Sequence, residues 1–275
     1  MKQHWKIADL PWAQLAPDRV DLDLLQVVKT AALVEANSAD YVTYLHNVFS
    51  DDAEFKAAAN VWGEEEAQHG AALALWVEKV DPSFDFAASL ACFRAGYRLP
   101  LTATRSVRGS HAGELVARCV VESGTCSFYS ALRDSTQEPV LRQICHHIAQ
   151  DEAAHYRLFH THLRRYLAGQ SLGFGARVRV ALGRMHETGD DELAYAYYSA
   201  NLATRASPHY ERKACATAYW RRAMAHYQRR HLQSAAHMIL AAVDLKPGRA
   251  WVRWAVEGVW QLLQWRLNRL RRLAA

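Results

Sequence analysis

The 275-residue sequence has little of what marks disordered, fibrous or disulfide-bonded proteins. Glycine and proline occupy only 13 and 7 positions, which excludes collagen-like and low-complexity chains. The five cysteines are odd in number and form no C-x-x-C pair, so neither a disulfide framework nor a zinc ribbon is expected. The first residues lack the apolar stretch of a secretory signal, and no run of 18 uncharged apolar residues occurs. We therefore expect a globular, cytoplasmic protein.

Charge is distributed unevenly along the chain. Residues 1–165 carry a net charge of −5, whereas residues 166–275 carry +10. The contrast predicts two units, at 1–167 and 168–275. A basic region can meet nucleic acid, an anionic lipid surface or an acidic protein, or it can simply face solvent, and charge alone does not choose among these.

Helical periodicity runs through almost the whole chain without convincing strand alternation, which predicts an all-α protein. Four long helices are expected, at 20–49, 52–80, 108–134 and 137–167. They form two hairpins, because Asp51 and Asp52 suit a helix start and Pro139 suits the first turn of the next helix. Residues 81–107 are long enough for a crossover with a short helix, so the hairpins can share one four-helix bundle. Further helices are expected near 190–205, 209–230, 232–245 and 250–273.

Two E-x-x-H motifs lie on the expected second and fourth helices. They are Glu66–His69 and Glu152–His155, and the i, i+3 spacing places a carboxylate and an imidazole on one helix face. Glu35 precedes the first motif by 31 residues, and Glu122 precedes the second by 30. At a rise of about 1.5 Å per residue, a round trip of this length up one helix and down its antiparallel partner returns to nearly the same height. The spacing therefore predicts six converging side chains.

Those six side chains are typical of a metal centre. Four buried carboxylates would cost many kcal/mol without compensating charge, and two divalent cations remove that cost. The same ligand set, a Glu from each of two helices and a Glu-x-x-His from each of two others, holds two metals in four-helix bundles. The predicted metal ligands are Glu35, Glu66, His69, Glu122, Glu152 and His155. The alternative is that Glu35 and Glu122 lie on the surface and the histidines are hydrogen-bonded core residues.

The motifs resemble those of the ferritin-like di-iron carboxylate proteins, and most closely those of soluble acyl-carrier-protein desaturases. Trp62-Gly-Glu-Glu-Glu-Ala-Gln-His-Gly70 is similar to the desaturase pattern W-x-x-E-E-x-x-H-G, and Asp151-Glu-Ala-Ala-His155 is similar to D-E-x-x-H. The resemblance covers about residues 25–165. It implies a ferritin-like four-helix bundle with additional C-terminal helices, and two iron ions, with manganese or a mixed pair as the alternative.

The resemblance also implies roles for neighbouring residues. Glu65 and Asp151 would each accept the second ring N–H of a ligand histidine, and Trp62 would extend one of these chains. Thr125 follows Glu122 by three residues and, with Glu122, would lie at the face where oxygen reacts. The implied activity is an oxidase, oxygenase or desaturase that uses O₂, an external electron-donor protein and an organic substrate, such as an acyl chain on acyl carrier protein.

Two other functions stay open at this stage. Rubrerythrins share the ligand set and scavenge peroxide or O₂, although their rubredoxin-type cysteine pairs are missing from this sequence. A helical metal-binding or interaction protein without catalysis is the second alternative. A homodimer is compatible with either, and nucleic acid is not expected as a partner.

The C-terminal part carries two further patterns. Tyr219, Ala223, Ala235, Ile239, Ala242 and Pro247 have spacings compatible with one tetratricopeptide-like helix pair, or with a plain helical hairpin. Residues 251–272 are rich in tryptophan and arginine. They are expected either to contact a membrane surface peripherally or to dock an acidic carrier protein through Arg266, Arg269, Arg271 and Arg272.

Overall fold

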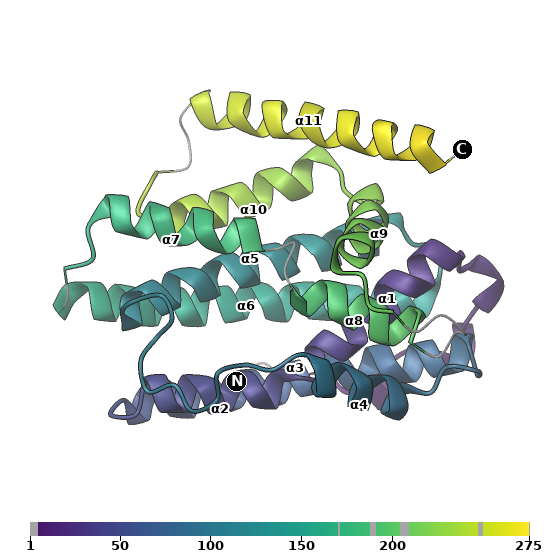
Figure 1. Ribbon diagram of the computed structural model, residues 1–275, viewed down its shortest axis with the longest axis horizontal. Helices are drawn as coiled ribbons and strands as arrows, with labels where there is room; N and C mark the ends of the chain where they lie inside the picture. Colours follow the sequence, from purple (N-terminus) through teal and green to yellow (C-terminus); the bar gives the residue numbers. More distant parts are fainter. Residues whose placement is uncertain (1–4, 170, 188–190, 204–208, 247–249, 275) are drawn as a thin grey trace. The chain divides into compact units, whose positions relative to one another are not determined.

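The computed structural model describes residues 5–169, 171–187, 191–203, 209–246 and 250–274 (Figure 1). Every regular element in these ranges is a helix, which confirms the all-α prediction for this part of the chain. The chain divides into two compact units, neither of which is continuous in sequence. Unit 1 comprises residues 1–104, 133–148 and 189–222, and unit 2 comprises residues 105–132, 149–188 and 223–275.

Unit 1 is built on the N-terminal helices. They are α1 (Leu22–Glu35), α2 (Ser38–Val48), α3 (Ala53–Val80) and α4 (Phe86–Gly96), preceded by short 3-10 turns at Ile7–Asp9, Trp12–Gln14 and Pro17–Arg19. The helix expected at 52–80 is confirmed as α3, and the Asp52 side chain caps it by accepting a hydrogen bond from the Phe55 N–H. The crossover at 81–107 contains the expected short helix, α4.

The single helix expected at 20–49 is wrong, because α1 ends at Glu35 and α2 begins at Ser38. The guanidinium of Arg94, on α4, donates to the Ala36 carbonyl at 2.9 Å and to the Asn37 side chain at 3.2 Å. The Asn37 N–H bonds to the Val34 carbonyl, three residues back, which tightens the last turn of α1. Hydrogen bonds from Arg94 on α4 therefore stabilise the break between α1 and α2. Such contacts between distant parts of the chain cannot be predicted from hydrophobic periodicity.

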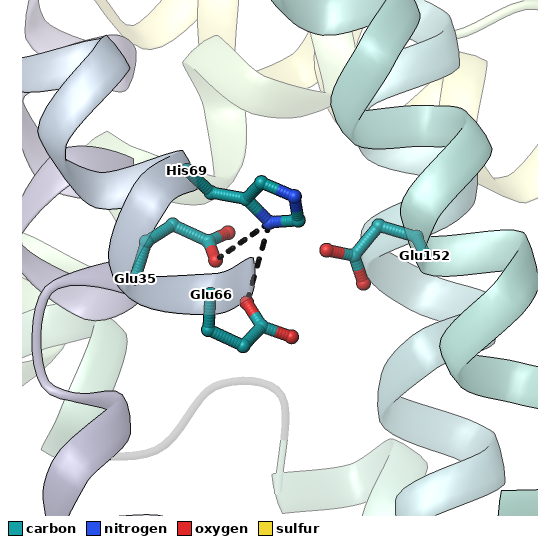
Figure 2. A group of neighbouring side chains, drawn as sticks. All are labelled: Glu35, Glu66, His69 and Glu152. Atoms are coloured by element: carbon teal, nitrogen blue, oxygen red, sulfur yellow. Dashed lines mark ion pairs between the residues drawn. The ribbon is translucent and has the colours of Figure 1, made fainter. Parts of the chain in front are cut away.

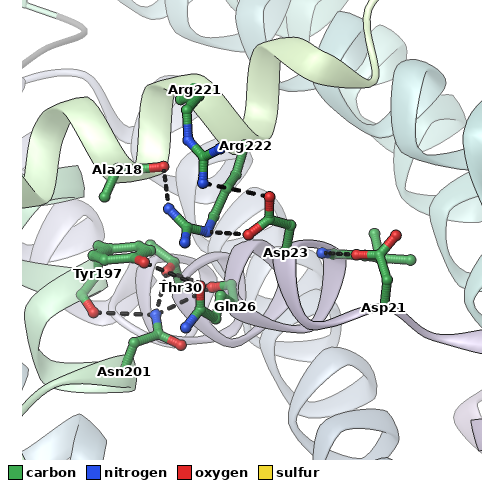
Figure 3. A network of polar contacts seen from close by, with 10 residues as sticks. Asp21, Asp23, Gln26, Thr30, Tyr197, Asn201, Ala218, Arg221 and Arg222 are labelled. Carbon is green, nitrogen blue, oxygen red and sulfur yellow. Dashed lines mark hydrogen bonds and ion pairs between the residues drawn. The ribbon is translucent and has the colours of Figure 1, made fainter. Parts of the chain in front are cut away.

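Helix α8 (Asp191–Asn201) covers α1 within unit 1. Figure 3 shows the polar contacts: the Tyr197 hydroxyl donates to Gln26, and the Asn201 amide reaches Gln26 and Thr30. On α9 (Arg212–Ala225), Arg222 forms an ion pair with Asp23 at 2.7 Å. Because α3 packs against α1 as well, most side chains of α1 are buried.

Two helices, α5 (His111–Ser135) and α6 (Pro139–Gly169), contribute residues to both units. They confirm the hairpin expected at 108–134 and 137–167, and Pro139 occupies the first position of α6 as predicted. The remaining helices of unit 2 are α7 (Phe174–His186), α10 (Arg229–Ala242) and α11 (Ala250–Ala274). Helix α7 was not expected from the sequence, whereas α8 to α11 lie near their predicted ranges.

The structure bears on three predictions for the C-terminal part: the domain boundary, the tetratricopeptide-like helix pair and the absence of a membrane-spanning helix. The boundary at 167/168 falls inside α6, and residues 189–222 belong to the same compact unit as the N-terminal helices. The tetratricopeptide-like positions lie on α9 and α10, except Pro247, which is outside the described residues, and their pairing stays a prediction. In the described ranges, no helix is long and apolar enough to cross a membrane.

Candidate metal centre

Unit 1 contains the first cluster of predicted ligands. Glu35 is the last residue of α1, while Glu66 and His69 lie one turn apart in α3. All three side chains are buried, and their ligand atoms lie within 4.8 Å of one another. Figure 2 shows both carboxylates turned toward the His69 ring. The sequence prediction that Glu35 lies beside Glu66 is confirmed.

The distances in this cluster match a shared metal better than a hydrogen bond. Nδ1 of His69 lies 3.8 Å from Oε2 of Glu35 and 3.5 Å from Oε2 of Glu66. An N–H···O hydrogen bond rarely exceeds about 3.2 Å. Two ligand atoms that each lie about 2.1 Å from one cation are about 3.0 Å apart at a right angle and about 4.2 Å apart when opposite. Both measured distances fall within that interval.

The electrostatics of the first cluster also favour a cation. Burial and the neighbouring carboxylate of Glu66 raise the pKa of Glu35 from 4.5 to about 8. Two carboxylates in a low-dielectric site repel each other and lose hydration, so a negative charge on Glu35 is costly there. A divalent cation between them would reverse both effects.

Unit 2 contains the second cluster, with the same composition. Glu122 lies on α5, and Glu152 and His155 lie one turn apart on α6. Each side chain is only about 1% exposed, and Nδ1 of His155 lies 3.7 Å from Glu122 and 4.0 Å from Glu152. The ligand atoms of the three residues lie within 4.8 Å of one another. Glu122 is thus beside Glu152, as the 30-residue spacing predicts.

The surroundings of Glu122 are the clearest indication that this cluster suits a cation. Both of its carboxylate oxygens are buried, and neither accepts a hydrogen bond from any described residue. A buried carboxylate without donors costs several kcal/mol in an apolar interior. Nδ1 of His155 lies 3.7 Å from Oε2 of Glu122, beyond the usual range of a hydrogen bond. A metal ion bonded to an oxygen of Glu122 would remove this cost, so the residues fit the group that the sequence predicts.

Thr125 lies within hydrogen-bonding reach of the second cluster. Its hydroxyl donates to Oε2 of Glu152 and also lies 3.3 Å from the carbonyls of Val121 and Glu122 on its own helix. The bond to Thr125 uses one carboxylate oxygen of Glu152, and the other, Oε1, is buried. Thr125 therefore fixes the orientation of a predicted ligand, a role that the sequence does not indicate.

The residues predicted to orient the ligand histidines lie close to the ligands in sequence and are at least partly buried. Glu65 and Asp151 are half-buried and each precedes a ligand glutamate, while Trp62 is buried one turn before Glu66. Their predicted contacts with the histidine rings stay predictions.

Trp5 is a neighbour of the first cluster that the sequence does not reveal. Its ring stacks on His69 with centroids 6.2 Å apart and on His147 with centroids 5.1 Å apart. The Gln68 side chain donates to the Trp5 carbonyl at 3.0 Å, which fixes the segment against α3. Trp5 precedes the first helix, so no periodicity marks it as part of the site.

Comparison of the sequence with models of known protein families and with curated protein sequences gives no match. The assignment of this site therefore depends on its own chemistry. In each unit, two buried carboxylates and one imidazole are spaced to hold a metal ion. This donor set suits iron or manganese.

Proposed function

We propose that this protein is an O₂-dependent metal oxidoreductase acting on an organic substrate, with one metal ion, most simply iron, held by each cluster. The observation that carries the proposal is the repetition of one arrangement. Each cluster has two carboxylates and one imidazole, all buried, at distances of 3.5–4.0 Å from the ring nitrogen. Two carboxylates and one imidazole at these spacings form a typical ligand set for a metal ion, and this chain contains the set twice.

A single dinuclear centre is part of the proposal, and it is supported by the sequence resemblance to ferritin-like proteins. In such bundles a Glu from each of two helices and a Glu-x-x-His from each of the other two project inward and would hold the two metals. Three protein ligands per ion leave coordination positions open. The alternative is two separate mononuclear sites with the same ligands.

When bound, a pair of redox-active metal ions supplies the electrons that reduce O₂ and so provides the oxidant for a C–H bond. The chain contributes the surroundings. Burial of both clusters excludes bulk water, Thr125 holds Glu152 in one orientation, and Trp5 covers one face of the His69 ring. The proposal includes a separate electron-donor protein that resets the site, because the given sequence contains no rubredoxin-type cysteine pair.

Metal analysis of protein purified from its native host tests the site. We expect about two metal ions per chain, and their identity decides between iron and manganese. Glu66→Ala and Glu122→Ala each remove one ligand from one cluster, whereas Glu64→Ala removes an exposed carboxylate two residues from Glu66. Both ligand variants should lose metal while the control retains it. Full metal content in both ligand variants, or none in the wild type after loading with ferrous iron, would contradict the proposal.

The distance between the metals tests the dinuclear arrangement separately. X-ray absorption of the loaded protein should show metal–metal scattering at about 3.5–4 Å, as in other two-metal sites. Two bound ions without that scattering would indicate two mononuclear sites and would leave the ligand assignment intact.

Stopped-flow absorption of the ferrous protein mixed with O₂ tests the activity. An oxidation transient is expected, and its absence would exclude both oxidase and oxygenase. A transient whose decay accelerates only with an added organic compound supports the oxygenase or desaturase. Rapid turnover of peroxide without any such compound would instead support the scavenging oxidase.

A further inference from the structure

Helix α11 exposes large apolar side chains along the face that does not pack on α10. Val252, Leu263 and Leu267 are buried, and α11 contacts α10 within unit 2 (Figure 1). Among the described large apolar residues that are exposed, five lie on this one helix: Trp251, Trp254, Val259, Leu262 and Trp265. Trp254 is 77% exposed and Leu262 is 62% exposed. A concentration of this kind on one element marks an interaction surface.

The same face is strongly cationic. Residues 250–274 contain five arginines and one glutamate, and Arg266, Arg269 and Arg272 are exposed. The Arg269 guanidinium lies over the Trp265 ring, 5.6 Å from its centroid. Trp265, Asn268, Arg269 and Arg272 line an open hollow of about 380 Å³. Two guanidinium groups beside an aromatic ring and an amide suit an anionic phosphate group.

We propose that α11 lies along the surface of an anionic phospholipid bilayer. Trp254 and Trp265 enter the headgroup region, and Arg269 and Arg272 bind lipid phosphates. Exposed tryptophan combined with arginine is typical of interfacial helices, because the indole ring has an apolar body and a polar N–H. The proposal concerns unit 2 alone and does not depend on the metal centre.

The distribution of the apolar residues favours a flat lipid surface over an acidic protein. Trp251 and Trp265 are 14 residues apart, which is about 21 Å along a helix. Binding energy at a protein interface concentrates in a compact centre, whereas a membrane surface contacts the whole line. Since no described helix can cross a bilayer, contact through α11 is peripheral.

Sedimentation of the full chain with vesicles tests the proposal. The probes are vesicles of phosphatidylcholine with phosphatidylglycerol and vesicles of phosphatidylcholine alone. We expect binding to the anionic vesicles that weakens as salt rises from 0.1 to 1 M, because the Debye length falls from about 10 Å to about 3 Å. Replacing both guanidinium groups in Arg269→Gln/Arg272→Gln should weaken binding about 30-fold.

Two control variants match these changes elsewhere on the surface. Arg98→Gln/Arg105→Gln removes the same charge from exposed positions outside α11, and Leu22→Ser removes an exposed apolar side chain from α1. Both should bind vesicles like the wild type. Circular dichroism and metal content should be unchanged in every variant, which separates loss of binding from loss of folding.

Insertion is measured with lipids brominated near the headgroup, which quench tryptophan at short range. Quenching should be strong in the wild type and largely lost in Trp254→Ser/Trp265→Ser. Absence of binding to anionic vesicles at 0.1 M salt would overturn the proposal and leave an acidic protein as the partner of this face. Binding that survives both double substitutions in α11 would also overturn it.

Discussion

Gly70 on α3 lies directly against the backbone of Ala36. A Cβ atom added to Gly70 would lie 2.7 Å from the Ala36 nitrogen and 2.9 Å from its Cα atom. Ala36 follows Glu35 and Gly70 follows His69, so the close approach of α1 and α3 is one residue away from two predicted ligands. The glycine at the end of the W-x-x-E-E-x-x-H-G motif therefore has a steric reason: it lets a carboxylate on α1 reach the His69 ring.

Gly70→Ala should separate α1 from α3 and lower the metal content of the first cluster. Backbone atoms cannot give way as a flexible side chain can, so we expect a loss of about 1–3 kcal/mol in the free energy of unfolding. Gly258→Ala is the control, because Gly258 lies on α11 with open space around it. That change should be neutral or stabilise by up to about 1 kcal/mol. Unchanged metal content and stability in Gly70→Ala would contradict this role.

Thr125→Val should leave the fold intact and weaken metal binding at the second cluster. Loss of the hydroxyl frees the Glu152 carboxylate to rotate, and loss of a group that orients a ligand typically costs about 10–100-fold in metal affinity. Competition with a chelator measures that affinity. Thr43→Val is the matched control, since Thr43 also bonds to a carbonyl four residues back but on an exposed part of α2. Equal affinity in both variants would remove Thr125 from the site.

Local spacing was sufficient to predict which carboxylate and imidazole side chains cluster. An i, i+3 pair depends only on helix geometry, and so does the 30-residue return along α5 and α6 that brings Glu122 beside Glu152. Glu35 lies beside Glu66 as predicted, although the chain between them is broken into α1 and α2 instead of forming one helix. Trp5 could not be found this way, because stacking on His69 depends on how an irregular segment folds back. The Thr125–Glu152 bond depends on side-chain orientation, which spacing does not specify.

The fold was predictable where helix signals are local. Asp52 and Pro139 mark the starts of α3 and α6 by their own chemistry. The break after Glu35 was missed because Arg94, 59 residues away, satisfies it. The grouping of α8 with α1 was missed for the same reason, since Tyr197 and Asn201 contact residues more than 160 positions earlier.

Glu138→Gln should destabilise unit 1 although it conserves shape. Both oxygens of this buried carboxylate accept N–H groups: Oε2 from Trp76 Nε1 and Leu141 N, and Oε1 from Ala16 N. A glutamine must turn its NH₂ group toward one of these donors. We expect a loss of about 1–3 kcal/mol in urea unfolding.

Asp85→Asn makes the same acid-to-amide change at an exposed cap. There a single oxygen accepts one N–H, from Ala88. Asparagine caps helices as well as aspartate does. The free energy of unfolding of Asp85→Asn should therefore stay within about 0.5 kcal/mol of the wild-type value. A similarly small effect at Glu138 would show that its hydrogen bonds contribute little.

Glu187→Gln should remove stability at neutral pH and have no effect in strong acid. Hydrogen bonds from the Arg108 guanidinium hold the pKa of Glu187 below its usual value. Below about pH 4.3, the ordinary pKa of glutamate, the native state therefore binds fewer protons than the unfolded chain. The stabilisation is complete above that pH and is lost as the pH falls through the lowered native pKa of Glu187. We expect Glu187→Gln to cost about 1 kcal/mol at pH 7 in thermal unfolding, with the melting temperatures of the two proteins converging once the pH falls below the lowered native pKa. Glu257→Gln breaks a more exposed ion pair with Arg229 and should change stability less at either pH. A difference in stability between wild type and Glu187→Gln that stays constant from pH 7 into strong acid would show that packing, and not the charge on Glu187, supports the contact with Arg108.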